Sequence, residues 1–92
     1  MKFWFAQPDM GRDIMIAEAD SELHLEQALV VAHNQEVDEE TSEFGKSFYK
    51  KVSSLKNSKY IIDGELSEEE YEENIDNEET MFYANNYLRN TT

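Results

Sequence analysis

The sequence predicts an α+β fold in which a small antiparallel sheet, an N-terminal hairpin plus one further strand, packs with three to four helices. Three observations predict it. Two short runs of aromatic and branched residues lie close together near the N-terminus, segments of helical length follow them, and a third β-rich run begins near residue 60. A chain of 92 residues has the length of one small domain, residues 1–92, and residues 90–92 are expected to be frayed.

The hairpin is expected to consist of strands at about residues 2–6 and 13–18. Pro8, Asp9 and Gly11 lie between them and are typical turn residues. Neither strand alternates cleanly between apolar and polar residues, so both of its faces are expected to be covered. One face can pack on helices, and the other can pack on a second subunit or form part of an internal core.

Two helices are expected to follow. Asp20 or Ser21 can cap the first, Glu22 lies in its first turn, and its apolar residues run to an end near residues 33–35. The second is predicted by an apolar stripe at helical spacing, and Gly45 near its start weakens that prediction. The stripe consists of Phe44, Phe48, Val52 and Leu55.

The last third of the chain predicts a strand and two helices. The strand covers residues 60–62, and Ser67 with Glu70 three residues later fits a capping box at the start of an acidic helix. Tyr71 and Ile75 mark the inner face of that helix. The final helix, roughly residues 77–89, is expected to bury Met81, Ala84 and Leu88.

The composition limits the kinds of partner and cellular location that we expect. The net charge of −13 should repel nucleic acids and anionic membranes, so a basic protein is the expected partner and no direct nucleic acid binding is expected. The chain has no cysteine, and the apolar run at residues 3–6 is too short for a signal peptide or a membrane span. We therefore expect a cytoplasmic protein without membrane association. Because so short a chain is marginally stable alone, a homodimer is expected.

A metal site, a cofactor and catalysis are not expected. Gly64 and Glu70 match positions 6 and 12 of a calcium-binding EF-hand loop, but Lys59 and Ile61 then occupy positions that need oxygen ligands. His24 and His33 are nine residues apart and fit no metal-binding motif, and the chain has no glycine-rich phosphate loop. Catalytic residues, metal and cofactors are all predicted to be absent, and the protein is not predicted to be an enzyme.

The acidic block at residues 63–79 is the feature that most suggests a function. It holds ten Asp or Glu residues and no Lys or Arg. If it is largely helical it spans about 25 Å, or roughly one charge per 2.5 Å, which is comparable to about one per 1.7 Å along duplex DNA. The carboxylates expected to imitate phosphates are Glu65, Glu68, Glu69, Glu72, Glu73, Asp76, Glu78 and Glu79, with a second row at Asp38, Glu39, Glu40 and Glu43.

The same negative charge is compatible with two simpler roles. An acidic stretch is often only a solvated surface. The segment at residues 46–59 carries five lysines and no acid, so it could pair with residues 63–79, either within a subunit or between subunits.

In size, lack of cysteine and acidic blocks at residues 36–43 and 63–79, the chain resembles the small acidic proteins with which phages disarm host DNA-binding proteins. It is most similar in character to the Arn-type antirestriction proteins of T-even phages. The resemblance implies a dimeric DNA mimic that occupies the DNA site of a host restriction endonuclease. Inhibitors of CRISPR effectors and of uracil-DNA glycosylase are similar in size and charge, and the lysines at 46–59 depart from a uniformly negative mimic.

We therefore expect an inhibitor that occupies the DNA-binding site of a host nucleic-acid-binding protein, such as a restriction endonuclease or a nucleoid protein. The alternative is a non-mimetic protein–protein interaction module, anti-CRISPR-type or another phage inhibitor, whose acidity serves solubility. Aromatic residues would then carry the contact, at residues 3–5 or at Tyr83 and Tyr87.

Overall fold

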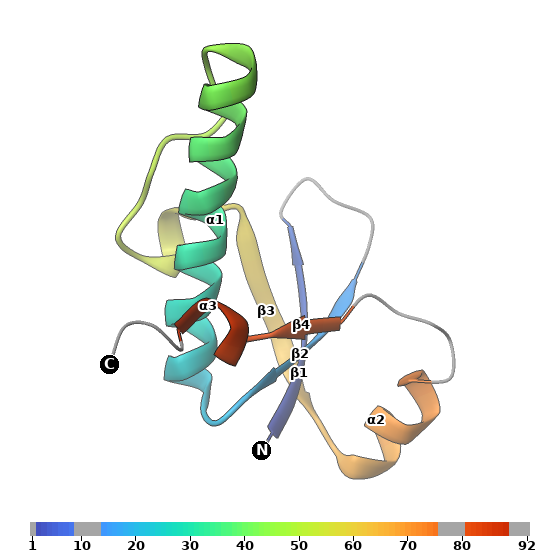
Figure 1. Ribbon diagram of the computed structural model, residues 1–92. Helices are drawn as coiled ribbons and strands as arrows, with labels where there is room; N and C mark the ends of the chain where they lie inside the picture. The colour runs from blue at the N-terminus through green and yellow to red at the C-terminus, as the bar shows by residue number, and fades with distance from the viewer. Residues whose placement is uncertain (1, 9–13, 76–80, 89–92) are drawn as a thin grey trace.

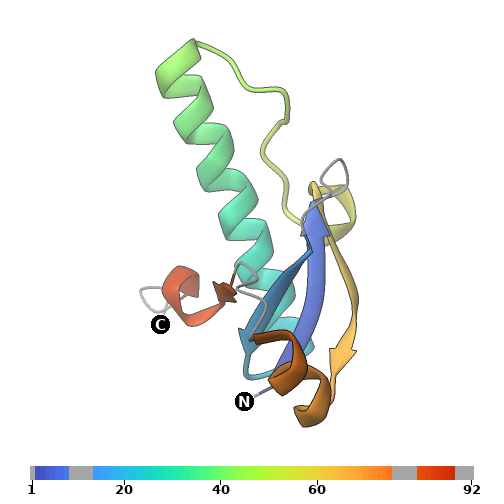
Figure 2. The same ribbon diagram turned by 90° about the vertical axis from the view of Figure 1, so that its right-hand side faces the viewer.

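A computed structural model describes residues 2–8, 14–75 and 81–88, and it confirms the α+β fold class. Four strands form one sheet in the order β3-β1-β2-β4. The long helix α1 lies on one side of this sheet and the short helix α2 lies on the other, at one end of β1 (Figures 1 and 2). The three-stranded antiparallel sheet of the prediction is thus extended by a fourth strand, which is parallel to its neighbour.

The predicted hairpin is present as β1 (Lys2–Pro8) and β2 (Met15–Ala19), which pair antiparallel. Trp4 pairs with Ala17 and both point toward α1, whereas Phe3 pairs with Glu18 and both point to the opposite side, because neighbouring residues of a strand alternate between faces. Both faces were expected to be covered. The face toward α1 is covered. The other face is covered in part: Ile16 and Leu66, which pair with Phe5 and Phe3, are buried there, whereas Tyr83 of β4 remains 43% exposed.

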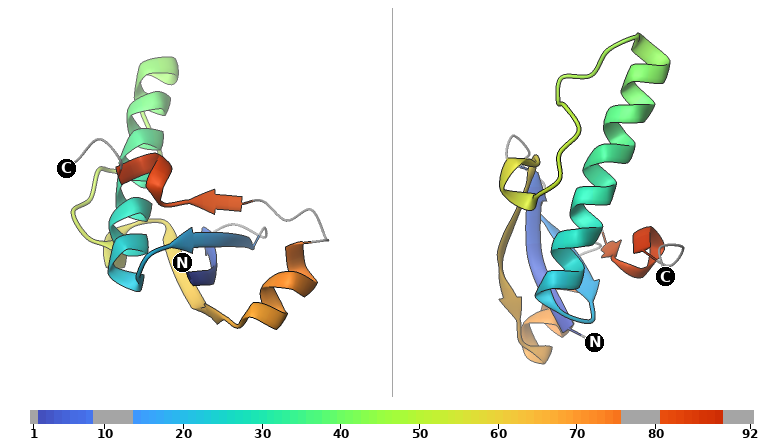
Figure 3. Two further views of the ribbon diagram at one scale, coloured as in Figure 1. Left: turned by 60° about the horizontal axis from the view of Figure 1, so that its bottom comes forward. Right: turned by 90° about the vertical axis from the view of Figure 1, so that its left-hand side faces the viewer.

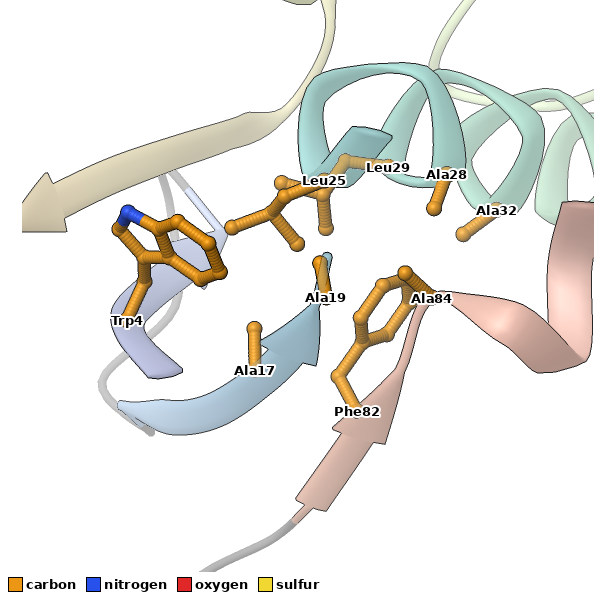
Figure 4. Packing of buried hydrophobic residues seen from close by; sticks show 9 residues of the cluster. All are labelled: Trp4, Ala17, Ala19, Leu25, Ala28, Leu29, Ala32, Phe82 and Ala84. Carbon is orange, nitrogen blue, oxygen red and sulfur yellow. The ribbon is translucent and has the colours of Figure 1, made fainter. Parts of the chain in front are cut away.

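The core lies between the sheet and α1 (Figure 4). Trp4 and Phe82 are its aromatic members, and Leu25 and Leu29 reach them from α1. Alanines on both the sheet and the helix allow the two layers to come close together; these are Ala17, Ala19, Ala28, Ala32 and Ala84. Trp4 is only 3% exposed, so the prediction that it could carry a partner contact is wrong. Burial of a side chain of its size contributes about 4–6 kcal/mol to folding, which places it in the core.

Helix α1 (Glu22–Phe44) begins where predicted and ends nine or more residues later than predicted. The Ser21 hydroxyl caps it by accepting a hydrogen bond from the His24 backbone N–H at 3.1 Å. It ends at Gly45, which adopts a left-handed φ of 80° and donates its N–H to the Thr41 carbonyl at 2.8 Å. Glycine adopts this conformation without the steric cost that a side chain adds, so it terminates the helix here.

The predicted second helix over Phe44 to Leu55 does not form. The chain after Gly45 runs back along α1 as an irregular segment, and only a short 3-10 turn, η1 (Leu55–Asn57), interrupts it (Figure 3). Asn34 of α1 holds this segment at Val52 by two hydrogen bonds: its side-chain amide donates to the Val52 carbonyl at 2.9 Å and its oxygen accepts from the Val52 N–H at 2.8 Å. These bonds replace the backbone bonds that a helix would have made.

The predicted helix-end position of His33 is also wrong, because His33 lies within α1 and is 1% exposed. Its Nδ1 accepts from the Lys59 backbone N–H at 3.2 Å, so the ring proton is on Nε2, which donates to the Lys50 carbonyl at 2.8 Å. His33 therefore connects two residues of the lysine-rich segment, Lys50 and Lys59, to α1, which is a structural role.

The last third of the chain differs most from the prediction. Strand β3 (Tyr60–Leu66) is longer than the predicted 60–62, and it is followed by α2 (Glu68–Ile75). Within the described residues, the predicted helix at 77–89 is instead β4 (Met81–Tyr83) followed by α3 (Asn85–Leu88). Residues 77–80 and 89 of that prediction lie outside the described residues. Ala84 is buried as predicted, whereas Met81 and Leu88 are half-buried.

Candidate acidic interface on α2

Helix α2 starts with the capping box that the sequence predicted. The Ser67 hydroxyl accepts from the Glu70 N–H at 3.1 Å, and the Glu70 carboxylate accepts in return from the Ser67 N–H at 3.1 Å. Both bonds satisfy amides that have no partner within the helix. Three acids in its first turn also interact favourably with the positive end of the helix dipole. The local sequence therefore specifies where this helix begins.

Aromatic stacking attaches α2 to the sheet. The ring of Tyr71 lies 3.8 Å from that of Phe3, centroid to centroid, with 20° between their planes. Ile75, one turn further along, shares this side of the helix and is 42% exposed. No residue of α2 is fully buried, so the helix lies on the surface with one side in contact with the sheet.

The remaining positions of α2 form a dense negative surface. Five of its eight residues are glutamates, and the helix is about 12 Å long, which is roughly one charge per 2.4 Å. Glu69 and Glu73 are one turn apart and lie on the side opposite Tyr71 and Ile75. Within the described part of the chain, none of these five carboxylates forms an ion pair. Their mutual repulsion is therefore not neutralised by any ion pair among residues 2–8, 14–75 and 81–88.

The continuous phosphate-like row predicted over residues 63–79 is corrected by the structure. Residues 63–66 belong to β3, so the described helix is about half as long as the 25 Å expected. Glu65 is exposed on this edge strand and pairs in register with Trp4, so it points to the face opposite Phe3 and Tyr71. Glu68, Glu69, Glu72 and Glu73 do lie together on α2. Asp76, Glu78 and Glu79 lie outside the described residues.

The predicted second row lies on the last turns of α1, and its charge is partly satisfied there. Asp38 forms an ion pair with Lys51 at 2.8 Å, and Glu40 accepts a hydrogen bond from the Ser47 hydroxyl at 2.5 Å. Glu39 and Glu43 are exposed on the same segment. In this row only part of the charge is available to a partner.

The lysine-rich segment at residues 46–59 was expected to be able to pair with residues 63–79. In the part of the chain that the structure describes, its ion pairs join it to α1 instead, and none joins it to residues 63–75. Lys51 contacts Asp38, and Lys59 contacts Glu36, with Lys59 much less exposed than Lys51. Tyr60 lies beside this second pair. Burial, the Glu36 carboxylate and Tyr87 raise the pKa of Tyr60 to about 12.

Glu18 is a residue that the sequence reasoning missed. It is half-buried on β2, and its cross-strand neighbours are Phe3 on β1 and Tyr83 on β4. Partial burial raises the pKa of Tyr71, and Glu18 and Tyr83 raise that pKa further, so all three groups lie close together. A signal was available, since Glu18 is an acid in an otherwise apolar strand, but the partners of β2 could not be deduced from it.

The described residues form no metal-binding cluster, and His24 has a local structural partner. No group of three or more acidic, histidine or cysteine side chains there is arranged to hold a metal ion. His24 serves the start of α1, where its Nδ1 accepts from the Asp20 N–H at 3.2 Å. None of the described helices is both long enough and apolar enough to cross a membrane.

The comparisons with known proteins add no relative. No protein-family model matches the chain, and no curated protein or solved structure is significantly similar to it.

Proposed function

We propose that the protein is a DNA-mimic inhibitor that occupies the DNA-binding site of a host nucleic-acid-binding protein, with a restriction endonuclease as the first partner to test. The observation that carries the proposal is the exposed, unpaired charge of α2. Its glutamates have no cation in contact among the described residues. Lys51 and Lys59, by contrast, form ion pairs with acidic residues of α1.

The crowding of glutamates on α2 favours a basic partner. Like charges one turn apart destabilise a helix by a few tenths of a kcal/mol per pair, and α2 contains several such pairs. A partner that offers Lys and Arg side chains at phosphate spacing would remove this repulsion on binding. A site built to bind about one negative charge per 1.7 Å of duplex offers such an arrangement.

A matched pair of charge reversals tests the proposal. Glu69→Lys with Glu73→Lys changes two exposed acids one turn apart on α2, and Glu39→Lys with Glu43→Lys makes the same change on α1. Both variants shift the net charge by the same amount. Immobilised wild-type protein should capture a DNA-binding protein from bacterial lysate and release it with duplex DNA and with moderate salt. The α2 variant should lose this capture and the α1 variant should retain most of it.

Equal losses in the two variants would show that only total charge matters, and the α2 interface would then be refuted. Retention in the α2 variant would refute it as well. Circular dichroism of both variants controls for folding.

One observation favours the alternative, a contact through aromatic residues. Phe44 and Phe48 at the far end of α1 are 68% and 78% exposed, and Phe48 packs edge-on against Tyr49 with centroids 5.0 Å apart. Large exposed aromatics on a protruding end are typical interface anchors. In this case Phe44→Ser with Phe48→Ser would abolish capture, and bound protein would resist both salt and DNA.

A further inference from the structure

Glu18, which lies on the same side of the sheet as α2, is placed to make a specific contact with a partner. Glu18 lies in the middle of an aromatic group: Phe3 and Tyr83 flank it in register on the neighbouring strands, and Tyr71 lies over Phe3. Glu18 is half-buried, yet its carboxylate forms no ion pair and accepts no hydrogen bond from any described residue. A carboxylate with restricted hydration and no partner is an electrostatic cost that a bound cation would relieve.

The neighbours of Glu18 decide which cation fits. Tyr83 is 43% exposed and is the cross-strand neighbour of Glu18, so its ring can offer a flat surface beside the carboxylate. A guanidinium group is planar, stacks on aromatic rings and donates two parallel hydrogen bonds to one carboxylate. An ammonium group makes point contacts only, and a metal ion would require more oxygen ligands than this single carboxylate supplies.

We propose that Glu18, together with Tyr83 and the stacked pair Phe3–Tyr71, is a binding site for an arginine side chain of a protein partner. The guanidinium would stack on the ring of Tyr83 and bind the Glu18 carboxylate through two hydrogen bonds. The proposal deepens the proposed function, on which it rests for the identity of the partner. Arginine is abundant in DNA-binding sites because its guanidinium group forms bidentate hydrogen bonds with phosphate. The basic partner that α2 attracts would therefore supply the arginine.

The position of the site supports this assignment. Tyr71 belongs both to α2 and to the aromatic group around Glu18, so the arginine site and the acidic helix are adjacent parts of one surface. The glutamates of α2 would attract a basic partner over a distance of about 8–10 Å. The less hydrated Glu18 site would then fix the position of one side chain, since partly buried charge pairs are screened less by salt.

The test uses small probes and the intact protein, so it does not depend on finding the partner. Acetyl-arginine amide is titrated into labelled protein, and NMR follows the Glu18 carboxylate and the rings of Tyr71 and Tyr83. Acetyl-citrulline amide is the neutral control of the same shape, and acetyl-lysine amide tests the preference for the planar group. We expect saturable shifts with arginine at these residues, weaker shifts with lysine and none with citrulline.

Variants separate the site from the general negative field. Glu18→Gln keeps the shape and removes the charge, and it should weaken arginine binding by about tenfold or more. Tyr83→Leu should weaken it to a smaller extent, because stacking is lost but the ion pair remains. Glu69→Lys with Glu73→Lys should leave the localised shifts at Glu18 in place.

Three results would overturn the arginine site: no saturable shift, equal binding to Glu18→Gln, or shifts spread evenly over all acidic residues. Failure of the two proposals can be told apart. If arginine binds at Glu18 while the α2 reversal leaves partner capture intact, the DNA-mimic proposal fails and the site stands. If capture depends on α2 but Glu18→Gln binds arginine normally, only the site fails.

Discussion

Replacing Ser67 by alanine should loosen α2 without unfolding the protein. The variant loses the hydroxyl that accepts from the Glu70 N–H, and the reciprocal bond from Ser67 N–H to the Glu70 carboxylate loses its fixed geometry. Loss of an N-cap costs about 1 kcal/mol. Helix α2 has eight residues, none of them fully buried, and isolated helices of this length are marginal in water. The loss should therefore appear locally.

The magnitude can be measured by amide hydrogen exchange. A loss of about 1 kcal/mol raises the population of the open helix about fivefold. The Tyr71 amide, which donates to the Ser67 carbonyl at 2.9 Å, is the reporter. Its exchange should accelerate about fivefold in Ser67→Ala, and amides of α1 and the sheet should change little. Added salt should slow exchange in α2 in both proteins, because it screens the repulsion between glutamates.

Ser21→Ala is the matched control, since it makes the same chemical change at the start of α1. Leu25, Leu29 and the other buried residues connect α1 to the core, so this variant should lower the global free energy of unfolding by about 1 kcal/mol. The reasoning would be refuted if both variants lowered global stability equally. It would also be refuted if Ser67→Ala left the exchange of α2 unchanged.

Two further predictions concern the segment that follows α1. Asn34→Ala removes both hydrogen bonds to Val52 and should lower the free energy of unfolding, measured in urea, by about 2 kcal/mol. The control Asn57→Ala loses one exposed 3.3 Å hydrogen bond and should lower it much less. Equal losses would contradict the role of Asn34 in holding this segment to α1. Burial first, and then Glu36 and Tyr87, raise the pKa of Tyr60 from 10.0 to about 12. The unfolded state therefore ionises first, so the stabilisation is complete below pH 10 and is lost as the pH rises toward 12. The loss should be about 1–2 kcal/mol, because Tyr60 is only partly buried and solvent reduces the full effect. Urea titrations across this range should give a flatter pH dependence in Tyr60→Phe, and an unchanged dependence would assign the loss to other groups.

Several elements could be predicted from the sequence because their signals act over a few residues. The hairpin follows from two apolar runs on either side of a turn, and the Ser67–Glu70 capping box was predicted from its spacing and is present. Asp20 and Ser21 were the two predicted caps of α1 for the same reason, and Ser21 is the residue that caps it. Gly45 gave a local signal too, but the apolar spacing that continues past it was given more weight than the glycine, so a second helix was predicted across the point where α1 ends.

The candidate site was predicted only in part. The glutamates of α2 were identified correctly as one exposed group, because their number and spacing are properties of the sequence. Glu18 was not identified, since its aromatic surroundings come from residues 3, 71 and 83, which lie on three other elements. Which acids are neutralised was also not predictable: Asp38 and Glu36 have lysine partners that are 13 and 23 residues away along the chain.

The sequence by itself determined the fold class, the sign and density of the surface charge, and the residues at which α1 and α2 begin. Composition, periodicity and capping are local properties, and they act whatever the rest of the chain does. Tertiary structure alone decided that residues 81–83 form a strand beside β2, that the segment after Gly45 lies along α1, and that Glu18 lies among aromatic rings. In each case the decisive free energy comes from contacts between residues far apart in the chain, which override weak local preferences.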